Sequence, residues 1–190
     1  MTTYVALLYS IILGGGRRVV MADLKAMAKT LGLGAPRTLV ATGNLVFEAE
    51  ATTERRIEDA LEARFAQTFG RHVDIIVRSA SDWHRLVEAN PFPEASRTMP
   101  SQVIARVGRA PIRPDALTFL EPYATQGERI AIAGDDLWVH FPAQPSQSRL
   151  LGVLTPTRLG GVGTLRNWNT IRGLGALAGA QATAHPDVQN

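Results

Sequence analysis

The chain has 190 residues, a formal net charge of +3 and no cysteine. This length suits one compact domain or two small ones, and a hydrophobic content of 45% is typical of a soluble globular protein. The lack of cysteine excludes disulfides, thiolate metal sites and cysteine nucleophiles, and it fits a reducing compartment. We therefore expect a cytoplasmic protein.

Arginine supplies almost all of the positive charge, because Lys25 and Lys29 are the only lysines. The arginines are spread along the chain, whereas a dedicated nucleic-acid binder normally carries a basic stripe with interleaved aromatic residues. A nucleic-acid partner is therefore open but not favoured. The bidentate donors of arginine suit phosphate or carboxylate, so a small anionic ligand stays open, although a compositional bias toward arginine explains the pattern more simply. No feature of the sequence indicates an oligomeric state.

The first predicted element is a buried strand over residues 3–10. Its apolar run, residues 5–13, follows no Lys or Arg and is too short to span a bilayer, so we expect no membrane segment. The next elements follow from helical spacing, β-branched runs and Gly or Thr boundaries. They are a helix at 21–31, strands at 37–41 and 45–47, a helix at 54–69 and a strand at 73–77.

This β-α-β-β-α-β order is the ferredoxin-like arrangement. A helix from Ser79 or Ser81 to Ala89 follows, and a linker runs to Pro100. The second half repeats the order. We expect strands at 102–107, 128–133, 137–141 and 162–165, with helices at 114–120, from Ser146 or Ser148 to about 154, and at 168–178.

The fold class is therefore α+β, with two small lobes of ferredoxin-like order and extra helices. We expect an N-terminal lobe with a linking helix at residues 1–95, a C-terminal lobe at 96–180 and a tail at 181–190. Trp168 is expected to be mostly buried and to join the final helix to the second sheet, since Ile171, Leu174 and Leu177 continue one apolar stripe.

Several short motifs together resemble the bacterial proteins grouped as domain of unknown function 1697. The resemblance covers nearly the whole chain, and no activity is established for that family, so it implies a two-lobed α+β fold and little about function. The matching pieces are Ala6-Leu7-Leu8, Gly14-Gly15, Met21-Ala22-Asp23-Leu24, Thr38 with Gly43-Asn44-Leu45-Val46-Phe47, Asn90-Pro91-Phe92 and, most specific, Arg166-Asn167-Trp168-Asn169-Thr170.

The chain also departs from the pattern of that family. Tyr9-Ser10-Ile11-Ile12 stands where the family usually has Arg-Gly-Ile-Asn, and Ala41-Thr42 stands where it has Gln-Ser. Arg149 replaces a common lysine. If the family shares a site at its first loop, this member has lost part of it.

The first loop, Gly14-Gly15-Gly16-Arg17-Arg18, is a candidate anion site. Glycines let backbone N–H groups converge on an anion, and the two arginines could supply charge. The loop lacks the Gly-Lys-Ser/Thr ending of a nucleotide P-loop and the spacing of a dinucleotide fingerprint. A flexible connection with solvated arginines explains it equally simply.

Two further candidates contain asparagine. Asn44 either binds a ligand or holds its own turn, since asparagine tolerates left-handed backbone and bonds to it. Arg166, Asn167 and Asn169 either grip an anionic or amide ligand or have structural roles, with an asparagine capping the final helix.

We expect no metal and no cofactor. The four histidines, His72, His84, His140 and His185, are far apart and form no short metal motif. His140 alternates with Val139 and Phe141, so it is predicted to share a sheet face with Trp138. The sequence contains no Gly-x-Ser-x-Gly elbow. It also has no pair of carboxylates that requires a catalytic explanation.

Two functions from different classes remain. The first is a non-catalytic module that binds a small ligand or a macromolecule in a polar cleft between the lobes. The second is an enzyme acting on a phosphorylated or nucleotide-like substrate, with arginine side chains that bind its anionic groups. The arginines concerned are Arg17, Arg18, Arg149 and Arg166.

Overall fold

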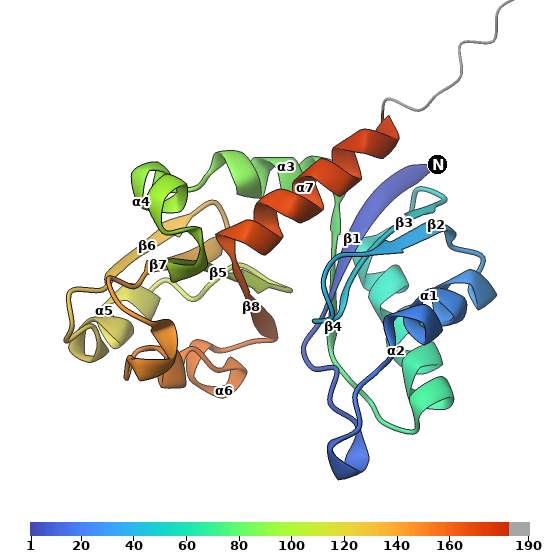
Figure 1. Cartoon of the computed structure of the whole chain (residues 1–190), viewed down its shortest axis with the longest axis horizontal. Helices are drawn as coiled ribbons and strands as arrows, with labels where there is room; N and C mark the ends of the chain where they lie inside the picture. Colours follow the sequence, from blue (N-terminus) through green and yellow to red (C-terminus); the bar gives the residue numbers. More distant parts are fainter. Residues whose placement is uncertain (183–190) are drawn as a thin grey trace, which may run out of the picture. The chain divides into compact units, whose positions relative to one another are not determined.

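The computed structural model describes residues 1–182, which form two compact units (Figure 1). The first unit contains residues 1–84 and the chain from 172 onward, and the second contains residues 85–171. Both divisions fall inside helices, namely α3 (Ala80–Glu88) and α7 (Trp168–Ala182). Of the expected tail, residues 183–190 lie outside the described part of the chain.

The first unit is built on a four-stranded antiparallel sheet with strand order β2-β3-β1-β4. Its elements, in chain order, are β1 (Thr2–Leu8), α1 (Met21–Thr30), β2 (Gly34–Thr38), β3 (Asn44–Ala49), α2 (Glu54–Phe69) and β4 (Ile75–Ser79). The predicted β-α-β-β-α-β order is therefore confirmed for this unit. Thr53 caps α2 by accepting from the backbone N–H of Arg56, and Gly70 ends the helix in the left-handed conformation.

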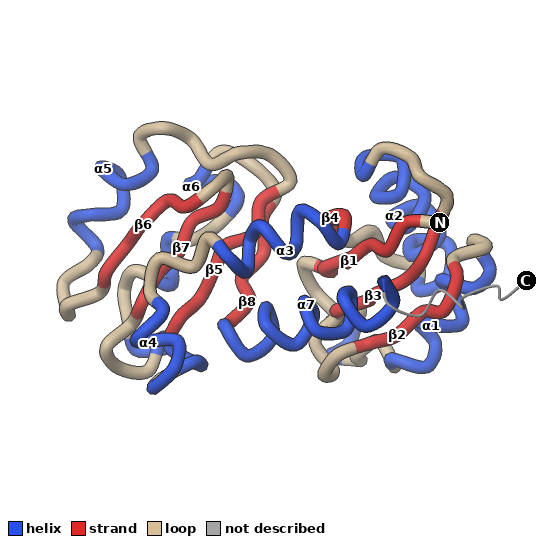
Figure 2. The backbone as a smooth tube through the Cα atoms, turned by 90° about the horizontal axis from the view of Figure 1, so that it is seen from above, coloured by secondary structure: helices blue, strands red, loops and turns tan. Residues whose placement is uncertain are grey.

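One face of this sheet packs against α1 and α2 (Figure 2). Strand alternation places Tyr4, Ala6 and Leu8 in that core, and the helices contribute residues such as Leu24 and Phe65. The intervening residues of β1 are also buried, so the sheet is covered on both faces. That is why the first strand reads as a continuous apolar run.

Within the first unit, the later part of α7 lies against the start of the loop after β2. Arg37 donates from Nη2 to the carbonyl oxygen of Leu177 at 2.6 Å. A Cβ on Gly173 would come within 2.7 Å of Leu39, so glycine permits the close approach of the helix here.

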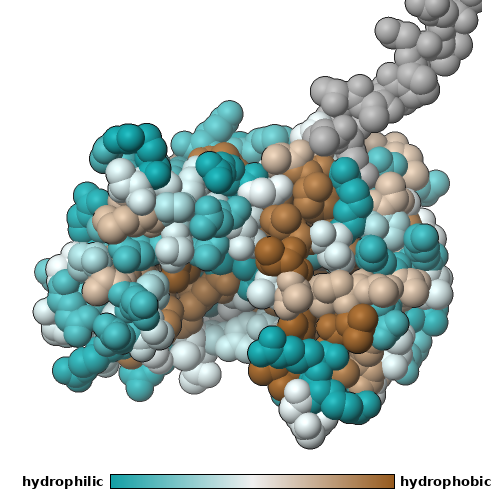
Figure 3. All heavy atoms as spheres, viewed as in Figure 1, coloured by the Kyte–Doolittle hydropathy of each residue, from teal (hydrophilic) through white to brown (hydrophobic). Residues whose placement is uncertain are grey.

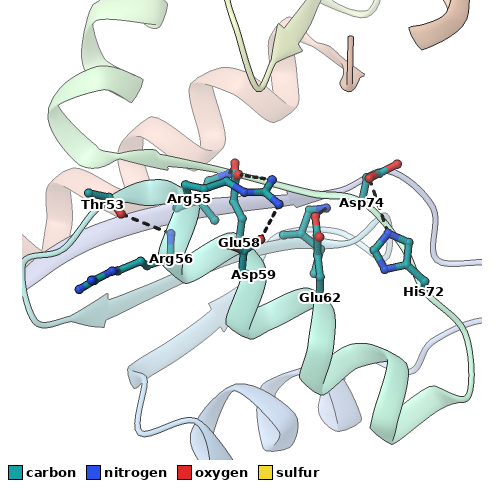
Figure 4. A network of polar contacts seen from close by, with 10 residues as sticks. Thr53, Arg55, Arg56, Glu58, Asp59, Glu62, His72 and Asp74 are labelled. Atoms are coloured by element: carbon teal, nitrogen blue, oxygen red, sulfur yellow. Dashed lines mark hydrogen bonds and ion pairs between the residues drawn. The ribbon is translucent and has the colours of Figure 1, made fainter.

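Helix α2 also supplies hydrogen-bond acceptors for backbone N–H groups on the outer edge of β4, and Figure 4 shows part of this arrangement. The Glu54, Glu58 and Glu62 carboxylates accept backbone N–H bonds of Ser79, Val77 and Ile75, at 2.7, 3.0 and 2.9 Å respectively. Four helical residues rise about 6 Å and two strand residues about 6.8 Å, so the two repeats match. An edge strand covered in this way cannot template pairing with another chain.

The second unit repeats the topology, with strand order β6-β7-β5-β8 and all pairs antiparallel. Its strands are β5 (Val103–Gly108), β6 (Arg129–Ala133), β7 (Asp136–His140) and β8 (Gly163–Asn167). One face carries the core, in which Ile104, Leu137 and Val139 pack on α5 (Ala116–Leu120) and α6 (Pro156–Leu159).

Two expectations about the second half are wrong. The helix predicted from Ser146 or Ser148 to 154 is replaced by two short 3-10 turns, Pro145–Gln147 and Leu151–Val153, and then by α6. Pro145, Gly152 and Pro156 interrupt a regular α-helix there. The expected linker contains a helix, α4 (Pro93–Thr98), which proline can start because its missing N–H would have no helical partner.

Within residues 1–182, no helix has both the length and the apolar character needed to cross a bilayer.

Candidate functional site

The first-loop glycines form a short 3-10 turn (Gly14–Gly16) at the tip of a hairpin-like excursion. Ile12 bridges Arg18, and the Leu13 and Val19 N–H groups donate to the carbonyls of Arg17 and Ile11. These two bonds join the segments that flank the glycines and hold the loop in a closed hairpin. Arg17 and Arg18 are exposed, and Figure 3 shows hydrophilic atoms at this tip.

Asn44 is fully buried at the start of β3, and its side chain organises the preceding turn. Its Nδ2 donates to the Leu39 carbonyl at 3.0 Å and to Thr42 Oγ1 at 2.8 Å. This geometry supports the turn role over ligand contact. Gly43 in the same turn contacts the segment after β1, since its Cβ would lie 2.6 Å from Ile11. The two stretches that depart from the resemblance are therefore neighbours in the first unit.

Arg149 and Arg166 share the second unit, but they do not converge. Arg149 is exposed next to Leu150, which belongs to the helix-covered core of the sheet. Arg166 lies on β8 opposite Ala105, and Leu165 beside it faces that core. Because strand residues alternate between faces, Arg166 is on the face opposite the core that holds Leu150, the neighbour of Arg149.

Arg166 is a buried cation. Its Nη1 donates to Thr164 Oγ1 at 2.8 Å and to the Leu165 carbonyl at 2.9 Å. Burial lowers its pKa to about 10. Of the neighbouring asparagines, Asn167 caps α7 by accepting from the Thr170 N–H at 3.1 Å, and Asn169 is exposed. The structural role predicted for an asparagine at this helix start is thus confirmed at Asn167.

The face that carries Arg166 is polar and aromatic. Register places Ala105 between Trp138 and Arg166, and it places His140 opposite Arg129. We call this set the second-sheet polar face; it consists of Arg129, Trp138, His140, Thr164 and Arg166. The predicted pairing of Trp138 and His140 on one face is confirmed.

Aromatic rings border this face. Trp168 is partly buried and its ring centroid lies 6.1 Å from that of Trp138, so it joins α7 to the second sheet as expected. Phe92 lies 6.1 Å from the His140 ring, and the Arg129 guanidinium lies 5.0 Å above Phe92. Tilted ring contacts and a cation–π contact therefore fix the walls of this face.

His140 is 8% exposed, and its Nδ1 accepts from Arg129 Nε at 3.4 Å. Burial, and then the charge of Arg129, lowers the pKa of His140 below its ordinary 6.5. The imidazole is therefore neutral at pH 7, with its proton on Nε2.

Two buried donors on this face have no hydrogen-bond partner among the described residues. They are Nε1 of Trp138, whose side chain is fully buried, and Nε2 of His140. Gln102, which precedes β5 and accepts at its backbone from Phe141, also has a buried Oε1 without a partner in that part of the chain. Sequence reasoning placed Trp138 and His140 together but gave no sign that their polar atoms would be unpaired.

A family model described as "Protein of unknown function (DUF1697)" matches residues 1–138. This chain belongs to the DUF1697 family. The match confirms the resemblance carried by the motifs from Ala6 to Phe92, whereas the Arg166–Thr170 motif lies outside the matched residues. It covers the whole first sheet and the second sheet as far as Trp138.

A solved structure of a conserved bacterial protein from Streptococcus pneumoniae is similar to this chain. That protein is 18% identical, and the TM-score of 0.71 extends over 93% of this chain and 98% of the other. At this identity the likeness shows a shared fold. No functionally curated protein matches the sequence.

Proposed function

We propose that this DUF1697 protein is a binding module for a small, acceptor-rich anionic ligand, held at the second-sheet polar face. The observation that supports the proposal is the pair of buried donors, Trp138 Nε1 and His140 Nε2, which lack partners among residues 1–182. A buried donor without a partner costs about 1–3 kcal/mol. Two of them on one strand are explained if a ligand supplies the acceptors.

The charges on the face favour an anion. Arg166 contributes a buried guanidinium, and the exposed Arg129 contributes a second positive charge that borders His140. A negatively charged ligand oxygen that accepts a hydrogen bond from the indole or imidazole N–H makes a charge-assisted hydrogen bond, and these positive charges stabilise it. Gln102 adds an amide that presents either an acceptor or, turned by 180°, an NH2 donor. The ligand we expect is therefore a carboxylate or phosphate compound of small size.

Binding is favoured over catalysis because the face offers donors rather than a nucleophile with its base. His140 is the one imidazole there, and its Nδ1 is occupied by Arg129. The alternative, an enzyme that grips a phosphorylated substrate with arginines, has less support. Arg149 neighbours Leu150 of the core on the face opposite Arg166, and Arg17 and Arg18 extend from an exposed tip.

A thermal-shift screen tests the proposal, with inorganic phosphate, adenosine monophosphate, glucose 6-phosphate, citrate and a short single-stranded oligonucleotide as probes. A ligand at one hundred times its dissociation constant stabilises the protein by about 2.7 kcal/mol. Trp138→Phe keeps most of the ring but removes the donor, so it should reduce the shift. Arg149→Ala, beside Leu150 of the core on the opposite face, should leave the shift unchanged. Stabilisation that survives Trp138→Phe would contradict the assignment of this face.

A further inference from the structure

Three side chains that can bind a metal ion meet in the first unit, where α2 approaches the segment leading into β4 (Figure 4). They are Glu62, on the helix, with His72 and Asp74, just before the strand. One ligand atom from each lies within 4.8 Å of the others. Two carboxylates and an imidazole are a donor set suited to zinc or manganese.

Glu62 is already held in position. It is 7% exposed, and its Oε1 accepts the Ile75 N–H at 2.9 Å. A hydrogen bond of this kind orients a metal-binding carboxylate and fixes it before the ion arrives.

His72 and Asp74 are close enough to close around an ion. His72 Nε2 lies 3.7 Å from Asp74 Oδ1, which is a charged contact only when the imidazole is protonated. Tetrahedral bonds of about 2.0–2.1 Å place ligand atoms roughly 3.4 Å apart. The side chains of His72 and Asp74 are 62% and 38% exposed, so both have room to shift rotamer and make up the difference.

An open space adjoins the cluster. A first cavity, of about 350 Å³, lies near Leu117 in the second unit and is not part of this cluster. A second cavity, of about 310 Å³, is lined by His72 and Asp74 themselves. Tyr9 and Arg71 also line this second cavity, and Arg71 Nη1 donates to the Ile12 carbonyl at 3.2 Å. An ion bound by the three side chains would thus keep a coordination position facing a space with a phenol and a guanidinium on its wall.

We propose that Glu62, His72 and Asp74 form a site for one divalent transition-metal ion, with an open position toward the cavity at Tyr9 and Arg71. The site lies in the first unit and is independent of the ligand proposed for the second-sheet polar face. It departs from the expectation, drawn from histidine spacing, that the chain holds no metal. The carboxylates neutralise the ion, and Arg71 leaves the rim suited to an anion on the metal.

Isothermal titration calorimetry tests this site on tag-free protein stripped with a chelator. Zinc chloride and manganese chloride are titrated separately in a buffer that does not bind metals. The expected result is saturable binding of one ion per chain by at least one of the two metals. Affinity should fall by at least about tenfold in His72→Ala, which removes a ligand.

The matched control is His84→Ala, which removes another exposed histidine of the same unit and should leave the affinity unchanged. Asp74→Asn gives a second loss that keeps side-chain volume, and circular dichroism verifies that each variant is folded. The proposal is overturned if neither ion binds saturably, or if His72→Ala binds as tightly as the wild type.

Discussion

Arg129 donates from Nε to Nδ1 of His140 at 3.4 Å, across the β6–β7 pair. This contact fixes the tautomer of a buried imidazole and leaves its Nε2–H directed away from the arginine. The same contact makes His140 hard to protonate, because a proton on Nδ1 would face a guanidinium.

A dependence of stability on pH follows from the lowered pKa of His140. In the unfolded chain this residue titrates near 6.5, and in the folded chain at a lower pH. Between the two values the unfolded chain binds more protons, so the free energy of unfolding decreases as the pH falls through that window. Urea denaturation at about pH 7.5 and about pH 5.5 should show a smaller loss for His140→Gln than for the wild type. Equal losses would contradict a buried, neutral His140.

Edge protection by α2 gives a second prediction. Glu58 is 2% exposed and accepts the Val77 N–H, so Glu58→Ala should cost about 1.5–3 kcal/mol, the range for a hydrogen bond to a charged group. Asp59 is the matched control, because its contact with Arg55 joins two exposed side chains. Asp59→Ala should change the free energy of unfolding by less than about 1 kcal/mol. Equal effects in denaturant titrations would show that the carboxylate does not hold the strand.

Alanine substitutions at Gly43 and Gly15 together distinguish the cost of backbone strain from the cost of a side-chain clash. Both have positive φ, +78° and +69°, so alanine at either position costs roughly 1–2 kcal/mol in backbone strain. Gly15 has nothing within 4 Å of an added Cβ, whereas at Gly43 that atom would meet Ile11 at 2.6 Å and Leu8 at 2.9 Å. Gly43→Ala should therefore destabilise the protein by about 1–3 kcal/mol more than Gly15→Ala. A smaller effect at Gly43 would mean that the loop after β1 yields easily.

Much of the fold could be predicted from local signals. Helix α2 follows from Thr53, the spacing of Ile57 and Leu61, and Gly70, and the strands follow from β-branched runs. The 3-10 turns before α6 could not be predicted, because serines that resemble helix caps compete there with Pro145 and Pro156. In such segments the chain order of caps and breakers decides the structure, and composition alone does not show which prevails.

The sites were harder to predict than the fold. The turn role of Asn44 and the cap role of Asn167 were each one of two alternatives that the sequence offered, since the backbone groups they bond lie close in sequence. The unpaired atoms of Trp138 and His140 could not be predicted, because pairing depends on what packs on the sheet face. Nor could the meeting of Glu62 with His72, because helix and strand must first pack together to bring them into reach.

The proposed ligand site depends above all on Trp138 Nε1–H as a hydrogen-bond donor. The most direct test is a ¹H–¹⁵N spectrum of the indole groups of the three tryptophans, titrated with the anions of the thermal-shift screen. The peak that disappears in Trp138→Phe identifies the donor. We predict that this peak moves downfield and saturates with at least one anion, while the Trp83 peak of the first unit stays in place. A Trp138 peak that responds to none of these anions, while the protein is stabilised by one of them, would contradict the claim.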